Sequence, residues 1–105
     1  MDAALSMTTL IGGLRDPDAE VRQRVASALG CLCVPAAEAE LARALVHDPS
    51  PDVRSACAEA LGALGARAPL VDAVGAEPDP FVVIFIERAL WKLDRQRRQS
   101  RSTVR

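Results

Sequence analysis

The sequence predicts an all-α protein, a right-handed α-solenoid of three helical hairpins with six helices in total. Three observations support this fold class: one segment occurs three times, the apolar residues of each copy have helical spacing, and each copy contains residues that favour the start of a helix. The 105-residue chain is 50% hydrophobic and 26% charged, which is the composition of an ordinary globular domain.

The repeat is clearest between residues 14–33 and residues 46–65. With a shift of 32 residues, the two segments are identical at nine of twenty positions. The identical pairs are Asp16/Asp48, Pro17/Pro49, Val21/Val53, Arg22/Arg54, Ala26/Ala58, Ala28/Ala60, Leu29/Leu61, Gly30/Gly62 and Leu32/Leu64.

A third copy occupies residues 75–94, shifted by a further 29 residues. It keeps most of the apolar positions but differs at the two charged ones, because Glu77 replaces the aspartate and Val83 replaces the arginine. The repeated positions that it retains are Pro78, Val82, Ala89, Leu90 and Leu93.

Each copy, together with the residues that precede it, forms a unit that predicts two helices separated by a turn. In the second unit we expect helices over roughly residues 36–46 and 51–64, since apolar residues in the latter recur at intervals of three and four. Ser50 and Pro51 favour a helix start, and Pro35 and Pro69 open the first helices of units two and three in the same way.

One such hairpin is too small to bury its own apolar face, so stacking of the hairpins must supply the core. We therefore expect a repeat domain over residues 1–94, with units of about 1–34, 35–66 and 67–94. Residues 95–105 contain five arginines and no carboxylate, and we expect a basic, partly disordered C-terminal tail there. Residues 1–94 carry 8 cationic and 14 acidic side chains, a net charge of −6.

The pattern Asp-Pro-x-x-x-Val-Arg-x-x-Ala-x-x-Ala-Leu-Gly-x-Leu resembles short HEAT repeats of roughly 30 residues, which also occur in phycobilin lyases. The resemblance covers nearly all of residues 1–94 and implies a binding scaffold. It also implies that the turn aspartate and the following arginine form a polar ladder between repeats. The ladder residues would be Asp16, Arg22, Asp48 and Arg54, with the ladder stopping at the third unit.

The sequence shows no membrane span, since its longest apolar run, residues 81–86, is far short of the roughly 20 residues required. The N-terminus lacks the basic and apolar regions of a secretory signal. Cys31, Cys33 and Cys57 are an odd number without a disulfide spacing, which favours a reduced, cytoplasmic chain.

No pattern predicts an active site, a cofactor or a metal ion. The single histidine, His47, suits the C-terminus of a helix, although Asp48 beside it makes a general base conceivable. Cys31 and Cys33 lack the further ligands of a zinc site, and no glycine-rich phosphate loop is present. We expect a protein that is not an enzyme.

The last helix, roughly residues 79–97, carries the candidate interface. Val82, Ile86 and Leu93 lie on its expected core face. Nearly opposite, it has aromatic, apolar and basic residues where the earlier units have polar or small ones. These candidate interface residues are Phe81, Ile84, Phe85, Arg88 and Trp91.

The leading hypothesis is therefore a small adaptor that binds a protein partner, or a second copy of itself, through this helix. Folding of the tail back over the same face is the alternative arrangement. One alternative function is an accessory subunit of an enzyme, such as a partner chain like the bilin lyases. Another is weak nucleic-acid binding through the arginine-rich tail, which the net negative charge of residues 1–94 disfavours.

Overall fold

The computed structural model describes residues 3–103, and the side chains of residues 6–99. Over this range it contains six α-helices, two short 3-10 helices and no strand, which confirms the all-α class. The elements are α1 (Ala3–Gly12), η1 (Gly13–Arg15), α2 (Ala19–Cys31), η2 (Pro35–Ala37), α3 (Glu38–His47), α4 (Pro51–Ala63), α5 (Arg67–Val74) and α6 (Pro80–Thr103).

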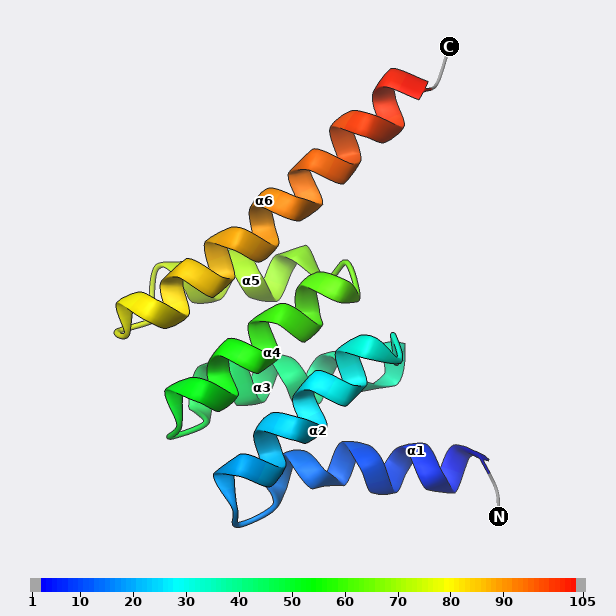
Figure 1. Ribbon diagram of the computed structural model, residues 1–105, viewed down its shortest axis with the longest axis vertical. Helices are drawn as coiled ribbons and strands as arrows, with labels where there is room; N and C mark the ends of the chain where they lie inside the picture. The colour runs from blue at the N-terminus through cyan, green and yellow to red at the C-terminus, as the bar shows by residue number, and fades with distance from the viewer. Residues whose placement is uncertain (1–2, 104–105) are drawn as a thin grey trace.

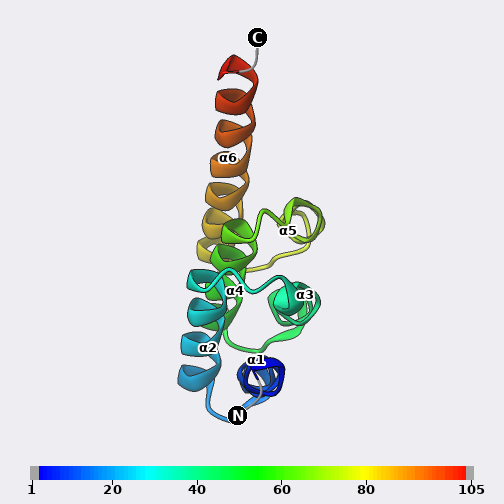
Figure 2. The ribbon, with the colours of Figure 1, turned by 90° about the vertical axis from the view of Figure 1, so that its right-hand side faces the viewer.

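The helices form three consecutive hairpins, α1–α2, α3–α4 and α5–α6, stacked one on the next (Figure 1). Seen from the side, α1, α3 and α5 make one layer and α2, α4 and α6 make the other (Figure 2). Helix α4 packs against both α2 and α6. The architecture is the expected solenoid, with α4 at its centre and α6 at its C-terminal end.

The second helix of each hairpin begins at a side-chain cap. Asp18 accepts a hydrogen bond from the backbone N–H of Glu20 at the start of α2 (2.9 Å), and Ser50 caps α4. Asp79 accepts one from the N–H of Phe81 at the start of α6 (2.8 Å). These caps satisfy N–H groups that have no partner within the helix, so each repeated turn defines where the next helix starts.

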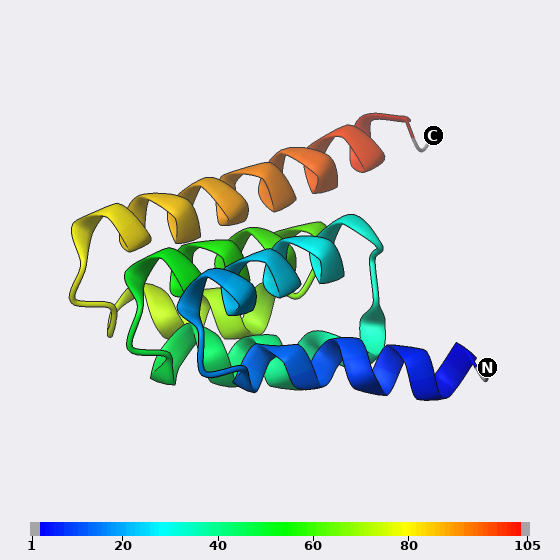
Figure 3. The same cartoon turned by 60° about the horizontal axis from the view of Figure 1, so that its bottom comes forward.

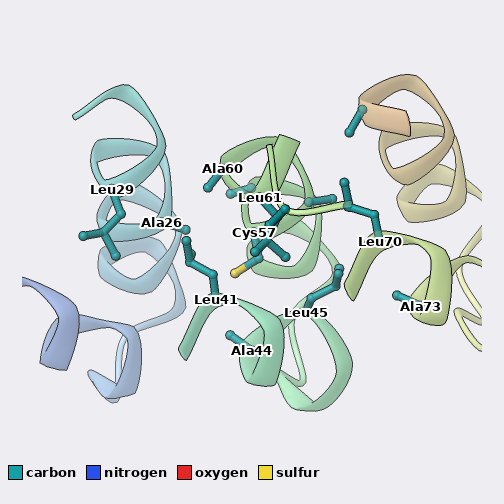
Figure 4. Close-up of a cluster of buried hydrophobic side chains, with 14 of the residues drawn as sticks. Ala26, Leu29, Leu41, Ala44, Leu45, Cys57, Ala60, Leu61, Leu70 and Ala73 are labelled. Atoms are coloured by element: carbon teal, nitrogen blue, oxygen red, sulfur yellow. The ribbon is translucent and has the colours of Figure 1, made fainter. Parts of the chain in front are cut away.

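The core runs through all three hairpins and consists of leucine, alanine, valine and isoleucine side chains (Figure 4). Leu41 and Leu45 of α3 and Leu61 of α4 are at most 1% exposed. They meet Leu29 from the first hairpin and Leu70 from the third in one cluster. Because each hairpin contributes side chains to this cluster, burial depends on stacking, as the repeat predicted.

The second helices of neighbouring hairpins approach each other closely at glycines. A Cβ atom added at Gly30 would lie 2.8 Å from the Cα atom of Ala60. One added at Gly62 would lie 2.9 Å from the Cβ atom of Ala89. Only a residue without a side chain fits at these two crossings, of α2 with α4 and of α4 with α6.

The termination of α2 and α4 follows one pattern, with a residue of positive φ just after the helix. That residue is Gly65 (φ 74°) after α4 and Cys33 (φ 49°) after α2. In both cases the next N–H bonds back to a carbonyl in the last turn, from Val34 to Leu29 and from Ala66 to Leu61. This is the Schellman arrangement, in which glycine is the residue that fits without strain.

Helix α6 is longer than predicted. The sequence led us to expect it to end near residue 97, but it continues to Thr103, into the segment expected to be a separate tail. Residues 95–103 contain no glycine or proline, and arginine and glutamine are good helix formers. The C-terminal part of α6 consequently extends past the end of α4, on which it packs (Figure 3).

Candidate functional site

Helix α6 lies at the end of the solenoid and packs against α4 and α5. One side of it belongs to the core: Val82 and Ile86 are fully buried, and Leu93 is 9% exposed. No repeat follows α6 within the described residues, so the opposite side of the helix faces away from the protein (Figure 1).

The opposite side carries the residues predicted as an interface, which we call the α6 surface: Phe81, Ile84, Phe85, Arg88 and Trp91. Phe81 is 73% exposed, Ile84 is 55% exposed and Trp91 is 58% exposed. Side chains of this size are unusual on a monomer surface when they lie together on one helix face, and such clusters mark binding sites.

Phe85 differs from the others, because it is half-buried and packs against the core. It forms part of the wall of a groove of about 460 Å³ between α2, α4 and α6. The sequence analysis did not predict this groove. Small residues of the repeats, at the crossings of α2, α4 and α6, line its floor. The residues that form the floor include Gly30, Ala60, Gly62 and Ala89, and the α6 wall includes Phe85, Arg88 and Lys92.

The α6 surface is bordered by positive charge. The guanidinium of Arg95 lies over the ring of Trp91, 5.2 Å from its centroid, in cation–π geometry. Asp94 lies on the other flank of α6 and pairs with Arg67 of α5. Among the side chains of residues 6–99, Arg88 and Lys92 form no ion pair within the chain.

The predicted ladder residues lie in the turn between the two helices of each hairpin and at the start of the second helix, and they connect neighbouring hairpins. The guanidinium of Arg22 donates to both carboxylate oxygens of Asp48, at 2.8 and 3.2 Å. Arg54 makes the equivalent pair of bonds to Glu77, at 2.9 and 3.1 Å. The carboxylate of Asp16, in the first turn, accepts the backbone N–H of Asp18.

The expectation that the ladder stops at the third unit was wrong. Glu77 accepts both bonds from Arg54, because its longer side chain still presents a carboxylate to the guanidinium. Its Oε2 atom also accepts the N–H of Asp79, as Asp48 does for Ser50. The ladder lacks its arginine only after this point, where Val83 stands.

The residues considered for catalysis do not form a site. His47 is the last residue of α3 and is exposed, and Cys31 and Cys33 are also exposed. Burial raises the pKa of the Cys57 thiol to about 12, and the nearby Asp48 carboxylate adds to this effect. A thiol with this pKa stays protonated near neutral pH and is a poor nucleophile. Within the described residues, no three metal-ligating side chains form a cluster.

Three stacked hairpins joined by a repeated ladder define an α-solenoid repeat protein. A family model described as HEAT repeats matches residues 7–96, and the chain therefore belongs to the HEAT repeat family. HEAT repeats are commonly protein-interaction modules and generally non-catalytic scaffolds. No curated protein matches the chain. None of the helices in the described residues combines the length and the apolar character needed to cross a bilayer.

Proposed function

We propose that this protein is a non-catalytic interaction module that binds a protein partner through the α6 surface. The observation that carries the proposal is the exposure of Phe81, Ile84 and Trp91 on the last helix. Large aromatic side chains beside arginine are the most frequent anchors of protein interfaces.

Comparison with the earlier repeats supports an interface rather than ordinary variation. The positions of Phe81 and Ile84 are occupied in the second unit by Asp52 and Ser55, and in the first unit by Glu20 and Gln23. The residues thus become apolar only in the third repeat, whose outer face no hairpin of the described residues covers. A solenoid face that is open to water is normally polar, so this apolar face indicates a partner.

Quantitative affinity purification tests this proposal. Wild-type protein is compared with the double variant Ile84→Asp/Trp91→Asp and with the control Val71→Asp. Val71 is also an exposed apolar residue, but it lies on α5. We expect proteins retained by the wild type and by the Val71→Asp control to be lost from the double variant, with helical circular dichroism unchanged in all three.

Retention of the same proteins by all three variants would contradict the proposal. If the double variant retains every protein that the wild type and the control retain, the α6 surface is not the interface. The accessory-subunit and nucleic-acid alternatives, and the cytoplasmic location, stay predictions.

A further inference from the structure

The α6 surface is not suited to continue the solenoid. At the two previous crossings the approaching helix lies over Gly30 and Gly62, where an added Cβ atom would clash. The equivalent position in the third repeat is Trp91. The ladder position at the same end is Val83, which offers no guanidinium to a following turn. A further hairpin in the same geometry would therefore clash with Trp91. The carboxylate in the turn of that hairpin would also have no arginine to pair with.

The spacing of the exposed residues nevertheless fits another helix. Phe81, Ile84, Arg88, Trp91 and Arg95 follow one another at intervals of three, four, three and four. This spacing places them along one side of α6, as at the contact between two helices packed side by side. The stretch from residue 81 to residue 95 is about 21 Å long at about 1.5 Å per residue.

The charges along this side have one sign. Arg88, Lys92 and Arg95 lie on it, whereas Glu87 and Asp94 lie on the other flank of the helix. Asp94 is already paired with Arg67. Partners that supply carboxylates beside apolar side chains would therefore complement this side of α6.

A second copy of the chain is the poorer fit. In an antiparallel two-fold pair, each flank of a helix meets the same flank of its partner. Centring such a pair between Ile84 and Trp91 would bring the two Arg88 side chains together. In a parallel pair, Arg88 and Arg95 would each face their own copies. Both arrangements juxtapose like charges at the contact, which disfavours association.

We propose that the α6 surface binds an acidic amphipathic helix of another protein, with apolar side chains against Phe81, Ile84 and Trp91 and carboxylates against Arg88 and Arg95. This inference rests on the proposed function and specifies the chemistry of the partner. The groove wall formed by Phe85, Arg88 and Lys92 adjoins this surface, and Glu59 of α4 lines the same groove.

The test uses two synthetic helical peptides of about 18 residues, about 27 Å in length. Both have leucines at intervals of three and four, and the flanking positions are glutamate in one peptide and lysine in the other. Anisotropy of the labelled peptide measures affinity, and the emission of Trp91, the only tryptophan, shows whether the peptide covers it. We expect the glutamate peptide to bind at least about tenfold more tightly and to shift Trp91 emission to shorter wavelength.

Charge reversal locates the contact. In the variant Arg88→Glu/Arg95→Glu, we expect affinity for the glutamate peptide to fall at least about tenfold and affinity for the lysine peptide to rise. The matched control is Arg97→Glu, also an exposed arginine of α6, which lies two residues, or about 200°, from Arg95 around the helix. This control should leave both affinities unchanged.

Four outcomes would overturn the inference. They are equal affinity for the two peptides, equal effects of the two charge variants, tighter binding of a DNA duplex than of the glutamate peptide, and a wild-type dimer in sedimentation at micromolar concentration. A chain that binds neither peptide, yet loses its partner on mutation of Ile84 and Trp91, would refute the acidic helix and retain the proposed function.

Discussion

Arg22 of the first hairpin and Asp48 of the second form an ion pair that is almost completely buried. The two side chains are 12% and 4% exposed. The Asp48 carboxylate also accepts the N–H of Ser50, and Arg22 also donates to the backbone carbonyl of Asp16. One pair of side chains thus joins two successive turns and the start of α4.

Replacing Asp48 with alanine should destabilise the protein by more than loss of a helix cap alone, which costs roughly 0.5–2 kcal/mol, because it also removes the carboxylate partner of the Arg22 guanidinium. Urea unfolding measures the difference in the free energy of unfolding. Arg24→Ala is the control, since its ion pair with Glu20 is largely exposed and should contribute less than about 0.5 kcal/mol.

A loss of about 1 kcal/mol or less for Asp48→Ala would show that the pair does not hold the hairpins together. The variant should also bind at the α6 surface with unchanged affinity at temperatures where it remains folded. Loss of binding without loss of stability would instead make Asp48 a binding residue.

The glycine crossings give a second prediction. Gly30→Ala places a methyl group 2.8 Å from the Cα atom of Ala60, a backbone atom that cannot move aside without separating α2 from α4. We expect a loss of about 1–3 kcal/mol in the free energy of unfolding. Gly75→Ala is the control, because it has negative φ and no atom within 4 Å of its added methyl group.

The control should be neutral or stabilising by up to about 1 kcal/mol, since alanine restricts the unfolded chain more than glycine does. Thermal unfolding followed by circular dichroism compares the two variants directly. If both have the same midpoint, the close approach of α2 and α4 does not depend on Gly30.

The sequence was sufficient to predict the hairpins and their core, because the repeated apolar positions recur with helical spacing. Leu29 and Leu61, which occupy the same position of the first two units, are both fully buried. The prediction that the ladder stops at the third unit was wrong because the guanidinium of Arg54 does not require an aspartate: it requires only a carboxylate within reach, which Glu77 supplies.

The exposed side of α6 was predictable for a similar reason: Phe81, Ile84 and Trp91 differ from their counterparts in the other units. The groove could not be predicted, because its shape depends on how closely α2, α4 and α6 approach one another. No single sequence position determines all of these distances. Phe85 therefore lies at the groove wall rather than on the fully exposed side.

The third prediction concerns the end of α2. Cys33 has φ 49°, a conformation that costs about 1 kcal/mol for a residue with a side chain, whereas Gly65 occupies the equivalent place after α4. Cys33→Gly should therefore stabilise the protein, by up to about 1 kcal/mol in urea unfolding. Gly65→Ala should destabilise it by about 1–2 kcal/mol.

Cys31→Gly is the matched control, because Cys31 lies within α2 and glycine there should cost up to about 1 kcal/mol. The two cysteine-to-glycine variants are thus expected to change stability in opposite directions. Destabilisation by both would contradict the positive-φ assignment at Cys33.

The last prediction concerns stability at alkaline pH. The buried Cys57 thiol has its pKa raised to about 12, whereas an unfolded cysteine ionises near 8.5. Between these values the unfolded chain releases a proton that the folded chain keeps, so the free energy of unfolding falls as pH rises. From pH 8 to pH 10 the loss should be about 2 kcal/mol, measured by urea unfolding with a reductant present.

Cys57→Val removes the titrating thiol and supplies the residue that the first unit has there, Val25. Its stability should fall less over this range than that of the wild type, and parallel curves for the two proteins would show that Cys57 ionises as readily in the folded chain as in the unfolded one.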